Sequence, residues 1–179
     1  SFGLQSADNR ELKCLGRIHT WEAFEENFHL ARACGFSNIN VDLMSALPGQ
    51  TVDTWRKTME KVTDLNPEHI SAYSLIIEEG TPFYEAYADH PELLPTEEVE
   101  REMYYETKTF LSSKGYERYE ISNYAKSGYE CRHNLSYWER TDYLGLGLGA
   151  ASLLGNVRKS NQSELPEYLK GNFAGEEEV

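Results

Sequence analysis

The sequence is short of cysteine, and this shortage excludes two kinds of site. Its 179 residues include three cysteines, Cys14, Cys34 and Cys131. They are odd in number and widely spaced, with no C-x-x-C pair, so we expect neither a disulfide framework nor a local zinc or iron–sulfur motif. Free cysteines fit a reducing compartment, and we expect a cytoplasmic protein.

Basic residues and long apolar runs are also scarce. Seventeen Lys and Arg stand against thirty Asp and Glu, a formal net charge of −13 that argues against a nucleic-acid-binding surface. No apolar run is long enough to cross a membrane and no secretory signal opens the chain, while association with a membrane surface cannot be read from the sequence. The 40% of apolar residues still allows a buried core, in one large domain or two small ones.

Strand and helix patterns alternate in the first half of the chain. Apolar and polar residues alternate over 38–43, and 69–77 is rich in β-branched and aromatic residues, so both segments are predicted strands. The opening residues 2–6 are predicted to be the end of another strand. Residues 20–34 and 51–65 each carry an apolar stripe at helical spacing. The order strand, helix, strand, helix, strand predicts a parallel α/β sheet, which could be part of a barrel.

The pattern changes after about residue 88. A helix is predicted at 96–114, and the tyrosine-rich stretch after it is interpreted as a strand followed by irregular structure up to residue 138. A short helix is predicted within 161–171. We therefore divide the chain into residues 1–88, the parallel α/β part, and residues 89–179, a smaller α+β region.

Gln5, Arg17 and Asp42 form the first candidate site. Gln5 and Asp42 lie at predicted strand ends, and Arg17 lies in the connection after the first strand. Arginine can bind a carboxylate through two hydrogen bonds, while a carboxylate or amide accepts from hydroxyl or amino groups. A zwitterionic ligand that carries a ribose would suit this set. The alternative is an ion pair between Arg17 and Asp42, with Gln5 on the surface.

The segment HNLSYW, residues 133–138, and the glycine-rich GLGLGA, residues 145–150, are further candidates. GLGLGA matches the dinucleotide pattern G-x-G-x-x-A, but no acidic residue on a following strand appears about 20 residues later, so we reject NAD binding. Close backbone packing, or approach to another ligand, explains the glycines better. His133 could bind haem or a metal, although a histidine beside a tryptophan is more often a packed residue.

Seven strings along the chain resemble one family in their order of appearance. They are SFGLQS, LKCLGRIHT, GFSNINVDLMSALPGQT, PEHISAYSLIIEEGTPF, YEISNYA, RHNLSYW and YLGLGLGAAS. Together they resemble the radical S-adenosylmethionine (SAM) proteins related to oxygen-independent coproporphyrinogen III oxidase, and among these the haem chaperone branch. The resemblance implies the C-terminal part of a partial (β/α)6 radical SAM barrel in residues 1–88, followed by the accessory α+β region of the family in residues 89–179.

The resemblance also implies roles for individual residues. Gln5, Arg17 and Asp42 match SAM contacts of the oxidases, and Ile76 falls at a further contact after the third strand. The motif H-N-x-x-Y-W marks the chaperone branch and implies a part in haem binding. Its residues here are His133, Asn134, Tyr137 and Trp138.

The family holds a [4Fe–4S] cluster on a C-x-x-x-C-x-x-C loop, where the cluster cleaves SAM to a deoxyadenosyl radical. That loop is absent from this sequence, which begins without methionine. We interpret the sequence as an interior fragment that is inactive alone, with its cluster ligands outside residues 1–179, and we assign it no catalytic residue and no metal ligand.

Two functions are consistent with the resemblance. The first is a haem chaperone that binds haem or another porphyrin, SAM and a cluster, with a haem-acceptor protein as partner. The second is oxidative decarboxylation of coproporphyrinogen III. HNLSYW favours the first, and the shared cofactor residues do not discriminate. A homodimer is left open, and an unrelated α/β domain with chance matches is the third alternative.

Overall fold

The computed structural model describes residues 1–178, which form two compact units that divide after Glu130. The first unit is built on a five-stranded sheet in the order β1-β2-β3-β5-β4. Its strands are β1 (Phe2–Gln5), β2 (Asn40–Ser45), β3 (His69–Ser74), β4 (Glu117–Arg118) and β5 (Asn123–Ala125). Strands β1, β2 and β3 are parallel, as the alternation of strands and helices predicts, whereas β5 pairs antiparallel with β3 and with β4.

The helices of this unit begin where the sequence offers a side-chain cap. Thr20, Thr51 and Thr96 each accept a hydrogen bond from the backbone N–H three residues later, which satisfies a donor that the first helical turn leaves free. The helices and one 3₁₀ turn are α1 (Asn9–Cys14), α2 (Trp21–Ala33), α3 (Val52–Asp64), α4 (Pro82–Tyr87), η1 (Pro91–Leu93) and α5 (Glu97–Ser113). The three long predicted helices are confirmed, while α1 and α4 were not predicted.

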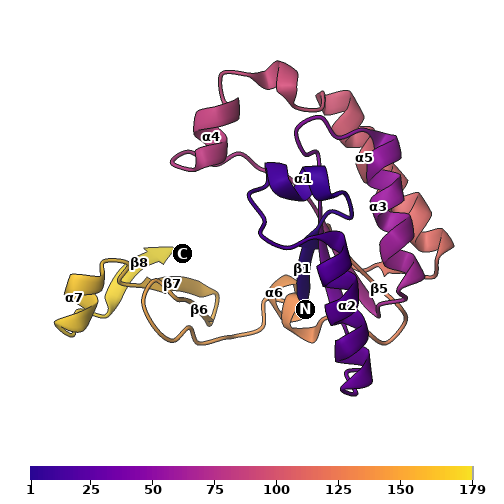
Figure 1. The fold of residues 1–179 in the computed structure, drawn as a ribbon. Coiled ribbons are helices and arrows are strands. Elements are labelled where there is room, and N and C mark those ends of the chain that lie inside the picture. Colours follow the sequence, from indigo (N-terminus) through magenta and orange to yellow (C-terminus); the bar gives the residue numbers. More distant parts are fainter. Residues whose placement is uncertain (179) are drawn as a thin grey trace. The chain divides into compact units, whose positions relative to one another are not determined.

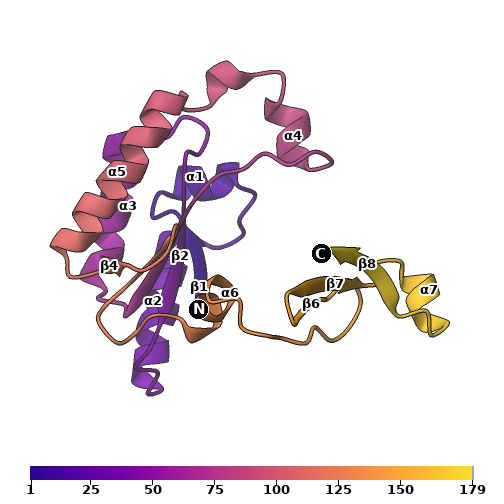
Figure 2. The ribbon, with the colours of Figure 1, turned by 180° about the vertical axis from the view of Figure 1, so that it is seen from behind.

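One hydrophobic core lies between the sheet and the three long helices. The apolar stripes of α2, α3 and α5 contribute Phe28, Trp55 and Met103, which are all nearly inaccessible, and the sheet contributes Val41 and Leu43. Figure 1 shows α3 and α5 running side by side, and Figure 2 shows the same pair from behind. The alternation predicted for β2 is confirmed, because its apolar side chains point into this core.

Trp55 and Thr107 join α3 to α5 inside the core. The indole Nε1–H of Trp55 donates to Thr107 Oγ1 at 2.8 Å, and neither residue is more than 4% exposed. Thr107→Val leaves this buried donor without an acceptor, so we expect the free energy of unfolding to fall by about 1–3 kcal/mol. Urea denaturation measures the change. Thr107→Ser is the control because it keeps the hydroxyl, and equal losses in both variants would contradict the role of the hydrogen bond.

The second unit, from Cys131 onward, carries a small antiparallel sheet. Its elements are α6 (Arg132–Trp138), β6 (Ala151–Leu154), β7 (Val157–Asn161), α7 (Leu165–Leu169) and β8 (Ala174–Glu178), with the strands in the order β6-β7-β8. The HNLSYW segment forms α6, so the irregular structure predicted there is wrong. Residues 132–138 form two turns of helix, and no side chain caps the first turn. Among residues 1–178 no helix is long and apolar enough to span a bilayer.

The structural division after Glu130 differs from the sequence division at 88/89. Helix α5 begins at Glu97, beyond the sequence boundary, yet its Met103 and Leu111 are fully buried in the core shared with α2 and α3. Strand β5 likewise extends the sheet of β1 to β3. The change in sequence pattern near residue 88 therefore lies inside one compact unit.

Gly145 explains part of the glycine-rich segment. A Cβ at this position would lie 2.1 Å from the carbonyl oxygen of Ala151, far inside any allowed contact. Two hydrogen bonds between the backbones of Tyr143 and Leu153 hold the two segments together here. Close backbone packing, one of the two explanations left open by the sequence, therefore accounts for Gly145.

Candidate functional site

The side of the sheet opposite the core is lined by polar residues, and we call it the polar face. Strand register brings these residues into rows, because parallel partners point to the same side. Gly3 pairs with Asp42, Asp42 with Ser71, and Ser71 with Asn123, while Asn40 pairs with His69. Register therefore places Gly3, Asn40, Asp42, His69, Ser71 and Asn123 on the polar face. Gln5, whose register partner is the core residue Leu43, joins this face through its side chain.

Gln5 lies at the end of β1 in a backbone conformation that non-glycine residues rarely adopt. Its φ is +73°, and the register with β2 shifts between Gly3 and Gln5. A left-handed residue of this kind costs about 1–3 kcal/mol and is concentrated at functional sites. The side chain folds back over Gly3, where a Cβ would stand 3.1 Å from Gln5 Nε2. Gly3 is the strand partner of Asp42, so the Gln5 amide and the Asp42 carboxylate lie on the same side of neighbouring strands.

Asp42 is half-buried and accepts two hydrogen bonds. Ser1 Oγ donates to Asp42 Oδ2 at 2.9 Å, and Asn40 Nδ2 donates to Oδ1 at 2.7 Å. A carboxylate has about four acceptor positions, so Asp42 can still accept from the amino or hydroxyl group of a ligand.

Beneath Asp42, four side chains form a connected polar network. His69 Nδ1 lies 2.6 Å from Asn40 Oδ1, and His69 Nε2 lies 2.7 Å from the hydroxyl of Tyr119. Ser71 Oγ donates to Asn40 Oδ1 at 3.2 Å. His69 is 5% exposed, and burial lowers its pKa below the ordinary value of 6.5, against smaller opposing effects of Asp42, Glu120 and Glu130.

The lowered pKa of His69 predicts an acid-sensitive contribution to stability. The unfolded chain takes up a proton on this residue near pH 6.5, while the folded chain resists protonation until lower pH. The contribution is therefore present above pH 6.5 and is lost as the pH falls through that value towards the folded pKa. We expect His69→Asn, which cannot titrate, to lose less stability on acidification than the unmodified protein.

Urea unfolding at about pH 8 and about pH 5.5 measures the difference, since these values bracket the ordinary pKa of histidine. The charged groups that face His69, namely Asp42, Glu120 and Glu130, are unchanged in both proteins. His29→Asn on the exposed side of α2 is the control. If the His69 variant and the unmodified protein lose the same unfolding free energy between the two pH values, the prediction is contradicted.

Asn123 adds a buried acceptor to the polar face. It is 5% exposed, and its Nδ2 donates to Glu120 Oε1 at 2.6 Å. Its Oδ1 accepts no hydrogen bond from any residue that the structure describes. An unpaired buried oxygen is costly, which makes this atom a natural acceptor for a ligand or a water molecule.

Arg17 lies in the exposed loop between α1 and α2. The loop returns to the end of β1, because His19 Nε2 lies 3.2 Å from the carbonyl oxygen of Leu4. Within residues 1–178 the guanidinium makes no ion pair or hydrogen bond, so the alternative Arg17–Asp42 ion pair is absent. The structure thus places Gln5 and Asp42 on the same side of neighbouring strands and leaves Arg17 as an unpaired cation on a neighbouring loop.

Ile76 follows β3 and is 76% exposed. The backbone N–H of Leu75 donates to the carbonyl oxygen of Ser45 at 2.9 Å, which ties the exit of β3 to the end of β2. Ile76 therefore lies beyond the carboxyl ends of the parallel strands, the edge where α/β barrels hold their ligands.

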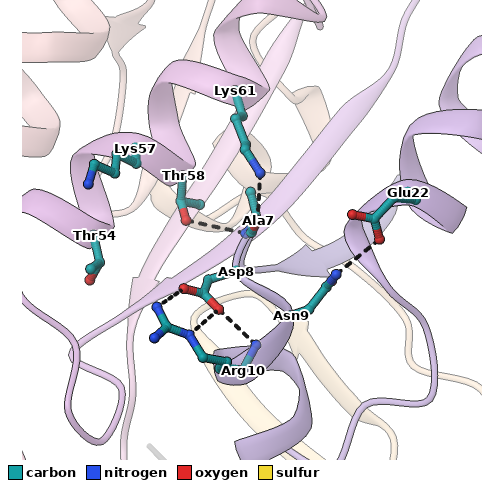
Figure 3. A pocket seen from close by; sticks show the side chains of 9 residues that line it. All are labelled: Ala7, Asp8, Asn9, Arg10, Glu22, Thr54, Lys57, Thr58 and Lys61. Atoms are coloured by element: carbon teal, nitrogen blue, oxygen red, sulfur yellow. Dashed lines mark hydrogen bonds and ion pairs between the residues drawn. The ribbon is translucent and has the colours of Figure 1, made fainter.

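A polar hollow of about 390 Å³ opens beside this edge, outside the polar face (Figure 3). Two of its cations are already engaged. Arg10 pairs with Asp8 at 2.7 Å, and Lys61 donates to the carbonyl oxygen of Ala7 at 3.1 Å. Only Lys57 among the three cations drawn in Figure 3 lacks a partner there, so the hollow offers no cluster of free charges.

The residues of the HNLSYW motif lie on α6 in the second unit. His133 is exposed, and its ring packs edge-on against Tyr137 at 4.9 Å between centroids, which in turn packs against Tyr143. Trp138 is 56% exposed and Asn134 is half-buried. The motif therefore presents an exposed imidazole and an exposed indole, and the imidazole packs on Tyr137.

Comparisons with known proteins identify the family. The sequence model of the radical SAM superfamily matches residues 1–62. The chain is 39% identical to the haem chaperone HemW of Bacillus subtilis (strain 168), over 94% of this chain and 45% of that protein. It is 34% identical to HemW of Escherichia coli (strain K12), over 97% of this chain and 46% of that protein. The chain is a HemW-like radical SAM protein.

The solved structure of coproporphyrinogen III oxidase (HemN) from Escherichia coli, a radical SAM enzyme, has the same fold. The TM-score is 0.77 at 23% identity, over 99% of this chain and 44% of that chain. The parallel strands β1 to β3 are accordingly part of a radical SAM barrel. The HemW-like chain spans less than half the length of each of these relatives.

The sequence did not single out His69 or Tyr119 as site residues. His69 joins the polar face only through strand register, and Tyr119 contacts it from the segment before β5, fifty positions along the chain. Asn40 offered a signal, because it alternates with Asp42 on the polar side of a predicted strand.

Proposed function

We propose that the protein containing this chain is a haem chaperone that binds SAM, a [4Fe–4S] cluster and haem. The observation that carries the SAM site is the position of Gln5, held in a left-handed conformation on the same side of the sheet as Asp42. The haem function is supported by the names of the two relatives quoted above, both haem chaperones, which match nearly the whole chain.

The chemistry of the polar face fits SAM. The ligand carries an ammonium, a carboxylate and two ribose hydroxyls. Asp42 can accept from an ammonium or hydroxyl group, the Gln5 amide can both donate and accept, and the unpaired Arg17 can bind a carboxylate. Ile76, exposed beyond β3, offers an apolar contact. When bound, SAM and the cluster supply the redox chemistry, while these residues bind and orient the ligand.

The cluster ligands must come from outside this sequence. Its three cysteines are far apart in sequence, and none lies in a C-x-x-x-C-x-x-C motif. Residues 1–179 alone should therefore hold no cluster, and every assay of SAM chemistry needs the protein in which the cluster loop is present.

His133 is our candidate for a haem ligand, or for a residue that supports one, with Asn134, Tyr137 and Trp138 beside it. We expect His133→Ala to weaken haem binding by about tenfold or more, as removal of a ligand or its direct support does at other metal sites. Haem titration followed by absorbance measures the affinity. His29→Ala, another exposed histidine on a helix, is the control. Unchanged haem affinity in a folded His133→Ala protein would contradict the assignment.

The alternative function is that of a coproporphyrinogen III oxidase, which the HemN fold allows. Anaerobic incubation of the cluster-loaded protein with SAM, a reductant and coproporphyrinogen III separates the two. A chaperone should bind haem and pass it to an acceptor protein without decarboxylating this substrate. Formation of protoporphyrinogen would favour the oxidase.

A further inference from the structure

Asn40 lies between Asp42 and His69, and its amide uses its whole hydrogen-bonding capacity. Its Nδ2 donates to Asp42 Oδ1 at 2.7 Å and to Ser1 Oγ at 2.8 Å. Its Oδ1 lies within hydrogen-bond distance of His69 Nδ1 and Ser71 Oγ. A carboxylate only accepts, so the Asn40 atom that faces Asp42 must be the nitrogen. The orientation of the amide is therefore fixed on chemical grounds.

This orientation determines which nitrogen of His69 carries its proton. Asn40 Oδ1 only accepts, so Nδ1 of His69 must donate to it. In the neutral ring Nε2 then accepts, and the hydroxyl of Tyr119 donates to it at 2.7 Å. The hydrogen bonds run in one direction, from Tyr119 through His69 and Asn40 to the carboxylate of Asp42.

Burial makes this arrangement rigid. His69 and Ser71 are 5% and 3% exposed, so neither can exchange its partner for bulk water without local opening. Burial also favours the neutral form of His69. A buried polar network in which each member is satisfied holds a single geometry.

We propose that His69 is a positioning residue for the ligand of Asp42: its Nδ1–H holds the amide of Asn40, which holds the carboxylate. The inference rests on the proposed SAM site, because the position of Asp42 affects binding only if Asp42 contacts the ligand. His69 itself lies beneath Asp42 on the polar face and contacts no ligand in this scheme.

A double-mutant cycle on the intact, cluster-loaded protein tests the coupling. The variants are His69→Leu, Asp42→Asn and the pair together, and the measurement is the dissociation constant for SAM by equilibrium dialysis. We expect His69→Leu to weaken binding by roughly fivefold to tenfold in the presence of Asp42, and by less than about twofold once Asp42 is replaced, because coupled residues are not additive. Equal effects in both backgrounds would overturn the proposal.

Two further variants, His69→Asn and Tyr119→Phe, distinguish a positioning role from a loss of folding. The asparagine amide can place an N–H near the position of Nδ1, so we expect this variant to restore most of the affinity that His69→Leu loses. Tyr119→Phe removes the hydroxyl at Nε2 and keeps the ring, so it should weaken SAM binding less than His69→Leu. A purely structural role would lower the unfolding free energy of these variants without changing the affinity of the folded protein.

The ring tautomer gives an independent readout. We expect ¹⁵N NMR of the imidazole to show the proton on Nδ1 of His69 at neutral pH. A proton on Nε2 would overturn the proposal whatever the affinities are. If Asp42→Asn leaves SAM affinity unchanged, the proposed SAM site fails; if Asp42→Asn weakens binding and His69→Leu does not, only the positioning role fails.

Discussion

Asp42→Asn is expected to weaken SAM binding by about tenfold to a hundredfold in the intact, cluster-loaded protein. A hydrogen bond to a charged group contributes about 1.5–3 kcal/mol, and every 1.4 kcal/mol is a factor of ten in affinity. Asparagine has nearly the same shape, but it replaces a charged acceptor by an amide whose nitrogen cannot accept. Isothermal titration calorimetry on the anaerobic protein measures the change.

Asp53→Asn is the matched control for this charge removal. Asp53 lies exposed in the first turn of α3, on the opposite side of the sheet from the polar face, and undergoes the same chemical change. It should leave SAM affinity within about twofold, since the charge is remote and solvated. An Asp42→Asn protein that folds and binds SAM as tightly as the Asp53→Asn protein would remove Asp42 from the site.

Gly145→Ala is expected to open the second unit locally. The new methyl group would overlap the backbone of Ala151, and no flexible side chain is available to move aside. We expect the local opening free energy to fall by about 3 kcal/mol, the upper part of the range for overpacking, because the backbone itself must shift. Hydrogen exchange should show loss of protection at Leu153 and through β6 and β7, with β2 unchanged.

Gly155→Ala is the control that separates the effect of close backbone approach at Gly145 from the effect of an unusual backbone conformation. Gly155 has φ +56°, and no atom lies within 4 Å of the position that a methyl group would take there. Its replacement therefore costs only the left-handed conformation, about 1 kcal/mol. Gly145 lies outside that region of φ. Equal loss of protection in the two variants would contradict the packing explanation for Gly145.

The sequence predicts the long elements well because their signals are local. The helices predicted at 20–34, 51–65 and 96–114 have ends within one residue of those of α2, α3 and α5, and His69 begins β3 as predicted. Helix α6 was missed because seven residues give too little periodicity and no side chain caps its first turn. The boundary after Glu130 was missed because α5 packs on α3 across the intervening residues 65–96, a contact that no local pattern reports.

The candidate site was predictable only in part, because some of its contacts join segments that are far apart in the sequence. Strand alternation places Asp42 on the polar side of β2, and the ordered family strings single out Gln5 and Arg17. The left-handed conformation of Gln5 is a property of the shift in register between β1 and β2. The contacts of His69 with Asn40 and Tyr119 depend on which strands become neighbours, so they appear only in the folded chain.

The antiparallel strands after β3 also decide how a barrel can be built on this sheet. One border is β4, two residues long and composed of Glu117 and Arg118, and such a short charged border is a poor template for further pairing. The other border is β1, whose outer backbone groups are unmatched by any strand among residues 1–178. Strand β1, which ends at Gln5, is therefore the border of this sheet that is suited to pairing with a further strand, and a strand added there would lie beside the polar face.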